Sequence, residues 1–249
     1  MKAMILAAGL GMRLRPLTND RPKALVEVAG HTLLEINLRR LAGFGIREVI
    51  VNVHHFADMV VDYLRKNHNF GLRVEISRED DLLLDTGGGL KKAAWFFQQD
   101  GHTQAPFLVH NVDVISSIDF ARMLQFHRDN HALATLAVQP RETSRRLLFD
   151  EDNRLCGRQT GTHGPEIVRP ARNTVALAFS GVHVISPRLL DMISEDGVFS
   201  IIATYLRLAA GGEPISAFRA DVYYWRDLGK PENITQATQD VEEGVVTIS

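Results

Sequence analysis

The sequence contains a single cysteine, Cys156, and no apolar run that approaches 18 residues. One cysteine excludes an internal disulfide and a metal cluster built from several cysteines. The short apolar runs exclude a transmembrane helix, and the amino terminus has no apolar core of signal-peptide length. These absences predict a cytoplasmic protein in a reducing compartment, without a membrane partner.

A strong net charge is also missing, because 28 Lys and Arg residues balance 30 Asp and Glu residues to give −2. This balance gives no indication of a nucleic-acid partner. The 249 residues are 45% apolar, which suits one large α/β domain or two small ones. Because no repeat or linker is visible, we predict one domain over residues 1–249 and leave its oligomeric state open.

Apolar runs of strand length alternate with amphipathic segments of helix length over the first 140 residues. This alternation predicts an α/β fold with a mostly parallel sheet and helices on both faces. The strands are expected at 3–8, 48–53, 72–77, 106–110 and 132–139, and the helices at 32–44, 56–66, 89–98 and 118–130. Further strands at 147–149, 154–156 and 175–186 predict a mixed, partly antiparallel region over one side of the crevice.

A basic, glycine-bearing loop, LAAGLGMRLRPLTNDRPKAL, follows the first predicted strand. Leu14 breaks the dinucleotide fingerprint, and no glycine precedes a Lys-Ser or Lys-Thr pair, so a dehydrogenase and a Walker loop are disfavoured. Gly9 and Gly11 let backbone N–H groups approach a polyphosphate closely. Arg13 can hold two phosphate oxygens with its planar fork, and Lys23 supplies a point charge. The loop therefore predicts a triphosphate site at the carboxyl end of a strand.

The longer stretch LAAGLGMRLRPLTNDRPKALVEVAGHTLLE closely resembles the N-terminal signature of sugar-phosphate nucleotidyltransferases. The resemblance implies a three-layer, Rossmann-like and glycosyltransferase-A-like fold, with nucleotide binding in 1–140 and sugar binding in 141–249. It implies catalytic roles for Arg13 and Lys23. It also implies nucleotide contacts from Leu6, Ala8, Gly9, Gly11 and Met12. Met12 departs from the family pattern, which has Ser or Thr at this position.

Three consecutive glycines stand in the segment LLLDTGGGLKKA, before a predicted helix. Such a run favours close approach of the backbone to a flat ligand. The family has a similar glycine-rich segment that packs against the nucleobase, and Asp85 stands where its first glycine often lies. The resemblance thus implies nucleotide contacts from Glu79, Thr86, Gly87 and Gly88.

The segment PFLVHNVDV ends in an aspartate at the carboxyl end of a predicted strand. A carboxylate in the crevice of a parallel sheet is well placed to bind Mg²⁺. The resemblance implies that Asp113 and Asp227, the latter in VYYWRDLGKPENITQA, are the two metal ligands. The family usually has Gly before the first of them, so Val112 is expected to narrow the space beside the metal or to reshape the loop.

The Glu-Lys-Pro motif whose lysine binds the sugar phosphate in many family members is missing. Arg158, Arg154 or Lys230 could supply the positive charge instead, and the sequence leaves this choice open. The resemblance implies that the strand containing Gly181 lines the sugar pocket. The predicted sugar-binding residues are Asn111, Gly157, Arg158 and Gly181.

The resemblance implies Mg²⁺-dependent transfer of a nucleotidyl group from a nucleoside triphosphate to a sugar 1-phosphate, with release of pyrophosphate. The compact length, the LDTGGG variant and the missing Glu-Lys-Pro motif resemble the short uridylyltransferases that act on N-acetylmuramate 1-phosphate, which favours UTP. GTP with mannose 1-phosphate is the alternative. A non-catalytic nucleotide-sugar-binding regulatory protein is the rival of another class, although such proteins usually lose the lysine or a metal carboxylate. Lys23, Asp113 and Asp227 are all present.

Overall fold

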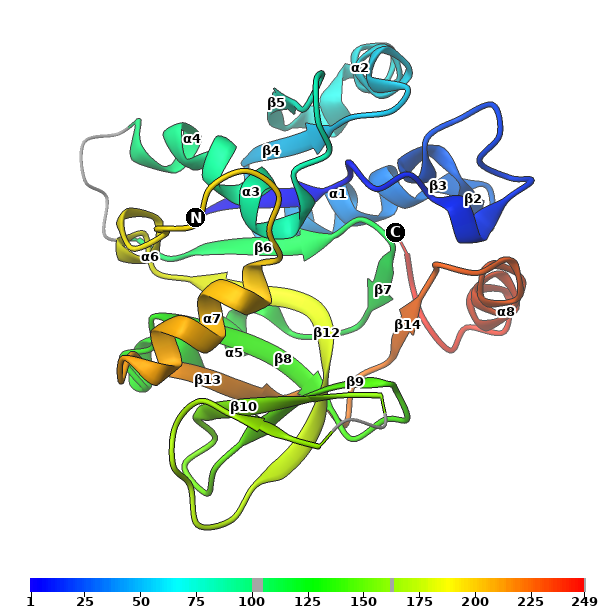
Figure 1. The fold of residues 1–249 in the computed structure, drawn as a ribbon. Helices are drawn as coiled ribbons and strands as arrows, with labels where there is room; N and C mark the ends of the chain where they lie inside the picture. The colour runs from blue at the N-terminus through cyan, green and yellow to red at the C-terminus, as the bar shows by residue number, and fades with distance from the viewer. Residues whose placement is uncertain (100–104, 162–163, 249) are drawn as a thin grey trace.

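A ten-stranded sheet runs through the computed structural model, which describes residues 1–99, 105–161 and 164–248 (Figure 1). The strand order is β11-β10-β9-β12-β6-β1-β4-β5, and β8 and β13 join through β12. The strands are β1 (Lys2–Leu6), β4 (Glu48–Val53), β5 (Arg73–Arg78), β6 (Phe107–Asn111), β8 (Ala134–Gln139), β9 (Arg145–Phe149), β10 (Leu155–Thr160), β11 (Glu166–Ile167), β12 (Val175–Ile185) and β13 (Ile215–Arg219).

The centre of the sheet is parallel and its other part is mixed, as predicted. β5, β4, β1 and β6 run parallel to one another, whereas β12 is antiparallel to β6, β8 and β9. β9, β10 and β11 form an antiparallel extension, which lies at the opposite end of the sheet from β4 and β5 (Figure 1). The carboxyl ends of β1, β4 and β6 therefore meet at one edge, where ligands bind in sheets of this kind.

Alternate side chains of the central strands enter two separate cores, because successive residues of a strand point to opposite faces. Ala3 and Ile5 lie in one core and Met4 lies in the other. The first core is covered by α1 (Leu33–Gly43), α2 (Ala57–Lys66), α5 (Phe120–Asp129) and α8 (Pro231–Glu242). The second is covered by α3 (Asp85–Lys92), α4 (Ala94–Gln98), α6 (Arg188–Asp191) and α7 (Ile201–Ala210). The predicted three-layer arrangement is confirmed.

Two short antiparallel pairs of strands lie outside the main sheet. The sequence patterns did not predict most of these four strands. They are β2 (Glu27–Val28) with β3 (His31–Thr32), and β7 (Val114–Ser116) with β14 (Trp225–Asp227). Single 3₁₀ turns form η1 (Met12–Leu14), η2 (Lys23–Leu25) and η3 (His68–Gly71). The β7–β14 pair joins segments more than 100 residues apart in sequence, so it is a purely tertiary feature.

The helix predicted from Gly89 begins earlier, at Asp85, so the glycine run lies inside α3. The backbone N–H groups of Gly87 and Gly88 donate to the carbonyl of Phe199. A Cβ atom at Gly87 would lie 2.3 Å from the Phe199 ring, and one at Gly88 would lie 2.4 Å from the Gly197 carbonyl. This close packing against the segment before α7 overrides the poor helix propensity of glycine.

The second half also contains more strand than its turn-rich sequence predicts. The strand expected at 154–156 continues to Thr160, and Glu166–Ile167 forms β11 against it. A Cβ at Gly157 would lie 2.3 Å from the Glu166 carbonyl, so this glycine permits the close strand pairing. In the described part of the chain, no helix has the length and apolarity that crossing a membrane requires.

Three histidines are buried in the two cores. Burial lowers the pKa of His110 and of His127 to about 4 and that of His183 to about 3. His127 is held between the hydroxyls of Thr135 and Ser186, at 2.9 and 3.0 Å. Each of these histidines stays neutral in the folded protein but can bind a proton in the unfolded chain. The free energy of unfolding therefore depends on pH.

We expect the free energy of unfolding to fall as the pH falls from about 6.5 towards 4. Below the unfolded histidine pKa the unfolded chain binds protons that the folded chain excludes, so stability present above pH 6.5 is lost on acidification. Urea unfolding between pH 7.5 and 5 measures this slope. His127→Gln should reduce it by the equivalent of one proton, about 1.4 kcal/mol per pH unit. Exposed His55→Gln should leave it unchanged, and equal slopes in both variants would contradict the assignment.

Candidate active site

The loop after β1 folds back on itself because Gly11 adopts a left-handed conformation, with φ of +65°. A Cβ at Gly11 would lie 2.9 Å from Cγ2 of Thr18 and 3.2 Å from Cβ of Lys23. The Thr18 hydroxyl donates to the Gly11 carbonyl at 2.9 Å. Glycine at this position thus lets the loop bring Lys23 beside the end of β1. Gly9 differs, since nothing lies within 4 Å of its Cβ position and its backbone faces open space.

A cleft of about 380 Å³ opens at the carboxyl ends of β1, β4 and β6. It has the size of a small-molecule site. Its lining residues are Leu6, Ala8, Gly9, Asn52, Leu83, Asp85, Thr86, Asn111, Asp113 and Val198. Residues predicted separately to bind nucleotide, sugar and metal therefore meet in one cleft.

Lys23 forms an ion pair with Asp113 in this region. The lysine is only 8% exposed and lies on the turn η2, while Asp113 follows β6 at the edge of the cleft. A buried ammonium group is costly without a partner, and the carboxylate supplies one. The structure thus brings together the predicted catalytic lysine and the first predicted metal ligand.

Asp227 lies beside Asp113 because β14 pairs with β7. Asp227 is opposite Val114 in the ladder, and the Leu228 N–H donates to the Asp113 carbonyl at 2.7 Å. The Asp227 carboxylate accepts from the Gly229 N–H at 2.8 Å. Two carboxylates on adjacent chain segments are the donor set that Mg²⁺ prefers, since it keeps waters and takes few protein ligands. Within the described residues no group of three or more metal-ligating side chains occurs, so a site here would have this two-carboxylate character.

Arg13 also belongs to this group of charged residues. A Cβ at Gly229 would lie 2.5 Å from Nη2 of Arg13 and 2.7 Å from Oδ1 of Asp227. The guanidinium and the carboxylate therefore approach the same backbone position from different segments. Met12, the neighbour of Arg13, is 61% exposed and does not line the cleft.

The predicted nucleobase residues separate into two groups. Thr86 lines the cleft, and its hydroxyl accepts from the Ile201 N–H at 3.0 Å. Gly87 and Gly88 pack against the segment before α7 instead of lining the cleft. Asp85 adopts φ of +58°, a backbone conformation that glycine adopts more readily than other residues.

Glu79 lies beneath the cleft and is 1% exposed. Its carboxylate accepts from the side chain of Asn52 at 2.7 Å and from the Leu84 N–H at 2.8 Å. Both oxygens are therefore engaged within the protein, so Glu79 positions residues that line the cleft. Its contact with a base stays a prediction.

Asn52 lines the cleft and was not among the predicted site residues. Its side-chain oxygen accepts from the Ala7 N–H at 2.7 Å, so it ties the glycine loop to β4 and, through Glu79, to the segment before α3. A Cβ at Gly89 would lie 2.8 Å from this amide and from Glu79, which requires glycine there too. The signal in the sequence was an asparagine near the carboxyl end of the apolar run EVIVNV.

The predicted sugar residues are not all close together. A Cβ at Gly181, whose φ is +73°, would lie 2.8 Å from the side-chain nitrogen of Asn111, so these two residues are in contact at the cleft. Gly157 and Arg158 lie on β10, two strands away from β12 in the sheet. Arg158 donates to Glu166 at 2.6 Å on that outer extension. The structure thus groups Gly181 with Asn111 and places Gly157 and Arg158 elsewhere.

Val112 takes no space from the cleft. Its side chain is 3% exposed and lies in the first core, and its carbonyl accepts from Asn37 at 2.9 Å. Of the two expectations for Val112, that it narrows the space beside the metal is therefore wrong, and that it reshapes the loop stays a prediction. Valine suits this position because its side chain is buried in the apolar first core and does not line the cleft.

The family comparison agrees with this geometry. Residues 2–147, more than half of the chain, match the model of the family described as "Nucleotidyl transferase". The chain belongs to this nucleotidyl transferase family.

The relatives of this nucleotidyl transferase include sugar-1-phosphate uridylyltransferases and guanylyltransferases. It is 35% identical over 238 residues to an N-acetylmuramate alpha-1-phosphate uridylyltransferase of Caulobacter vibrioides, with 92% of each chain covered. It is 30% identical over 248 residues to a mannose-1-phosphate guanylyltransferase of Mycobacterium tuberculosis, with 98% of this chain and 65% of that protein covered. The chain therefore spans nearly all of one relative and about two thirds of the other.

A solved structure supports the fold. The crystal structure of HddC from Yersinia pseudotuberculosis complexed with GMP-PN superposes with a TM-score of 0.74 and 22% identity, over 96% of this chain and 98% of that chain. At this identity the likeness concerns the fold alone.

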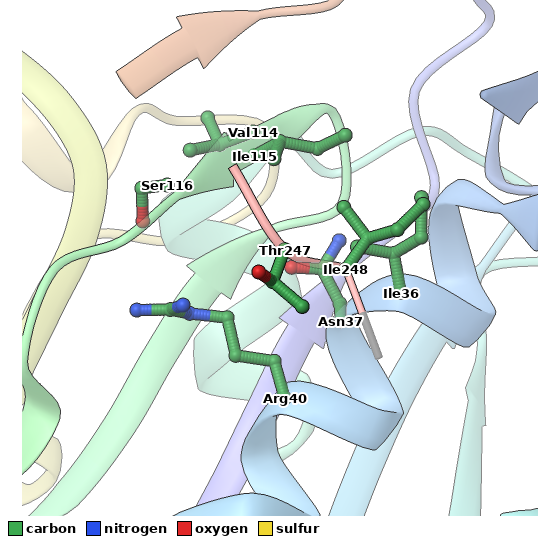
Figure 2. A pocket seen from close by; sticks show the side chains of 8 residues that line it. All are labelled: Ile36, Asn37, Arg40, Val114, Ile115, Ser116, Thr247 and Ile248. Atoms are coloured by element: carbon green, nitrogen blue, oxygen red, sulfur yellow. The ribbon is translucent and has the colours of Figure 1, made fainter. Parts of the chain in front are cut away.

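A smaller cavity of about 40 Å³ lies between α1 and β7, behind the strand that follows Asp113 (Figure 2). Nε of Arg40 and Oγ of Ser116 are buried there without a hydrogen bond to described residues, and burial lowers the pKa of Arg40 to about 10. Thr247 and Ile248 line it from the C-terminal segment. The cavity has room for about two or three waters and not for a nucleotide, so the larger cleft remains the candidate active site of the transferase.

We expect Gly229→Ala to reduce turnover on the order of 10²-fold while the fold is kept. The added methyl would displace the guanidinium of Arg13 and the carboxylate of Asp227. Misplacement of catalytic groups by about 1 Å costs this much in catalysis. Steady-state kinetics and thermal unfolding measure the two effects. Gly43→Ala is the matched control, because nothing lies within 4 Å of its Cβ position. Normal turnover in Gly229→Ala would show that Arg13 and Asp227 do not act from these positions.

Proposed function

We propose that the chain transfers a nucleotidyl group from UTP to N-acetylmuramate 1-phosphate, giving the nucleoside-diphosphate sugar and pyrophosphate. Nucleotidyl transfer to a sugar 1-phosphate is the activity of the named relatives. The observation that carries the proposal is the Lys23–Asp113 ion pair in a cleft at the carboxyl ends of parallel strands, with Asp227 on the adjacent segment.

The proposed reaction needs charge neutralisation and alignment more than proton transfer. An oxygen of the sugar phosphate attacks the α-phosphorus in line, and the bond from that phosphorus to the pyrophosphate oxygen breaks. Since a phosphate monoester is already a nucleophile, no general base is required, and rate enhancement comes from positioning and electrostatic stabilisation. Lys23 stabilises the α-phosphate, and Arg13 holds the departing pyrophosphate.

Asp113 and Asp227 are the residues that would hold Mg²⁺. When bound, this ion would neutralise phosphate oxygens as a Lewis acid. In the structure as it stands, the carboxylate of Asp113 compensates Lys23 instead. Arrival of an anionic substrate gives the ammonium group a second partner, so the lysine does not need to become an uncompensated buried charge.

The choice of UTP and N-acetylmuramate 1-phosphate rests on the Caulobacter relative, which matches this chain along 92% of both lengths. The Mycobacterium guanylyltransferase extends well beyond this chain and is less similar. GTP with mannose 1-phosphate is the second candidate because such relatives still match 98% of the chain. A non-catalytic nucleotide-sugar-binding protein is disfavoured by the intact Lys23, Asp113 and Asp227.

A product screen tests the proposed function. Four nucleoside triphosphates are each paired with N-acetylmuramate, N-acetylglucosamine, glucose and mannose 1-phosphates, and pyrophosphate release is followed with and without Mg²⁺. We expect the highest kcat/KM for UTP with N-acetylmuramate 1-phosphate, and only with the metal. Turnover of GTP with mannose 1-phosphate alone would replace the uridylyl proposal, and no turnover with any pair would favour the regulatory protein.

We expect Lys23→Ala to lose on the order of 10²-fold or more in turnover, by analogy with the loss of one donor that stabilises transition-state charge. Arg21→Ala is the matched control, because Arg21 is an exposed cation of the same loop that pairs with Asp20. Single-turnover kinetics at saturating substrates separate the chemical step from binding. A Lys23→Ala protein with near-normal turnover would remove this lysine from the mechanism.

A further inference from the structure

Arg141 lies just beyond the carboxyl end of β8, between β12 and β14. Its Nη2 donates to the Phe179 carbonyl at 2.5 Å, and its guanidinium carbon lies 3.6 Å from the centre of the Trp225 ring. The Trp225 indole N–H in turn donates to the Ser180 carbonyl at 2.7 Å. Stacking and hydrogen bonding therefore hold the guanidinium plane in one orientation.

The positive charge of Arg141 has no carboxylate partner among the described residues. Its Nε is buried without a hydrogen bond, and its Nη1 makes none to the described residues. Burial lowers the pKa of Arg141, and the nearby carboxylate of Asp227 opposes that shift. Several arginines of the second half differ, since Arg158 pairs with Glu166 and Arg226 pairs with Asp240. A partly buried, held and unpaired guanidinium is suited to an anionic ligand.

The position of Arg141 relates it to the sugar side of the candidate active site. It rests on the backbone of Phe179, two residues before Gly181, which touches Asn111 in the cleft. Trp225 and Asp227 share one face of β14, because alternate residues of a strand do so. Arg141 is therefore on the β12 side of Asp227, whereas Arg13 approaches that carboxylate from the glycine loop.

The three cations suggested by the sequence for the sugar phosphate lie in less suitable surroundings. Arg158 is on β10 and bound to Glu166. Arg154 precedes β10, and its backbone forms an isolated antiparallel β-bridge with Ser216 of β13. Lys230 is exposed, with its ammonium 3.6 Å from Glu232.

We propose that Arg141 binds the phosphate group of the sugar 1-phosphate and replaces the lysine of the missing Glu-Lys-Pro motif. The proposal rests on the proposed function, in which that phosphate lies beside Asp227. The free Nη1 edge donates to a phosphate oxygen, while Phe179 and Trp225 keep the fork in place. This assignment adds a residue to the candidate active site, so that the attacking phosphate has its own cation, separate from Lys23 and Arg13.

Arg141→Gln tests the assignment in the full-length chain with the substrate pair that the wild type turns over. We expect KM for the sugar 1-phosphate to rise about tenfold or more, as for a lost charge-assisted hydrogen bond, and KM for the nucleotide to stay within about twofold. Arg141→Lys keeps the charge and should recover part of the affinity. Arg145→Gln, an exposed arginine of the same segment, should behave as the wild type. An unchanged sugar-phosphate KM, or equal rises for both substrates, would overturn the proposal.

Calorimetric binding without metal or nucleotide provides a second readout that does not depend on turnover. The probes are N-acetylmuramate 1-phosphate, N-acetylglucosamine 1-phosphate, which lacks the lactyl carboxylate, and N-acetylmuramate, which lacks the phosphate. We expect Arg141→Gln to weaken the binding of both sugar 1-phosphates. Weakening confined to the two muramate probes would show that Arg141 binds the carboxylate, and failure of the wild type to bind either phosphate would also overturn the proposal. Binding that depends on Arg141 without turnover of any pair would contradict the proposed function alone.

Discussion

Val114 to Ser116 pair with Trp225 to Asp227 in a ladder of three residues, and the arrangement of the cleft depends on it. The pairing sets Asp227 beside Asp113, anchors Trp225 against β12 and places Gly229 next to Arg13. Each of these contacts joins parts of the chain that are distant in sequence. Such short ladders contribute little stability alone. This one persists because Val114 and Ile115 are buried in the first core and Leu228 is buried beside them.

Charge compensation is the second constraint on this region. Arg13, Lys23 and Arg141 lie around two carboxylates. Lys23 is buried and Arg141 is half-buried, so each of these two charges requires a partner or a ligand, whereas Arg13 is exposed. Lys23 has its partner in Asp113, whereas Arg141 has only the more distant field of Asp227. An imbalance of positive charge is what a site for two polyanionic substrates requires, because the substrates supply the missing negative charge.

The parts that could be predicted from the sequence have local causes. The run EVIVNV forms β4 over the predicted residues because a strand buried on both faces is continuously apolar. A ligand cleft at the carboxyl ends of the parallel strands could be predicted in the same way, and the roles of Lys23 and Asp113 in it stay predictions. The start of α3, the β7–β14 pair and the roles of Asn52 and Arg141 could not. They depend on tertiary contacts, such as Phe199 against the glycines, which no periodicity records.

The absence of a family motif therefore does not imply the absence of its chemistry. The cation that neutralises a phosphate can come from another part of the chain. In our proposal the cation follows the carboxyl end of β8, which pairs with β12, and the Phe179 carbonyl of β12 holds Arg141. The side chain of Gln139 donates to the carbonyls of Ala220 and Tyr223, which fixes the end of β8 to the segment leading into β14. The same contacts that carry Asp227 to the cleft thus also position the arginine, so both groups depend on one local arrangement of β8, β12 and β14.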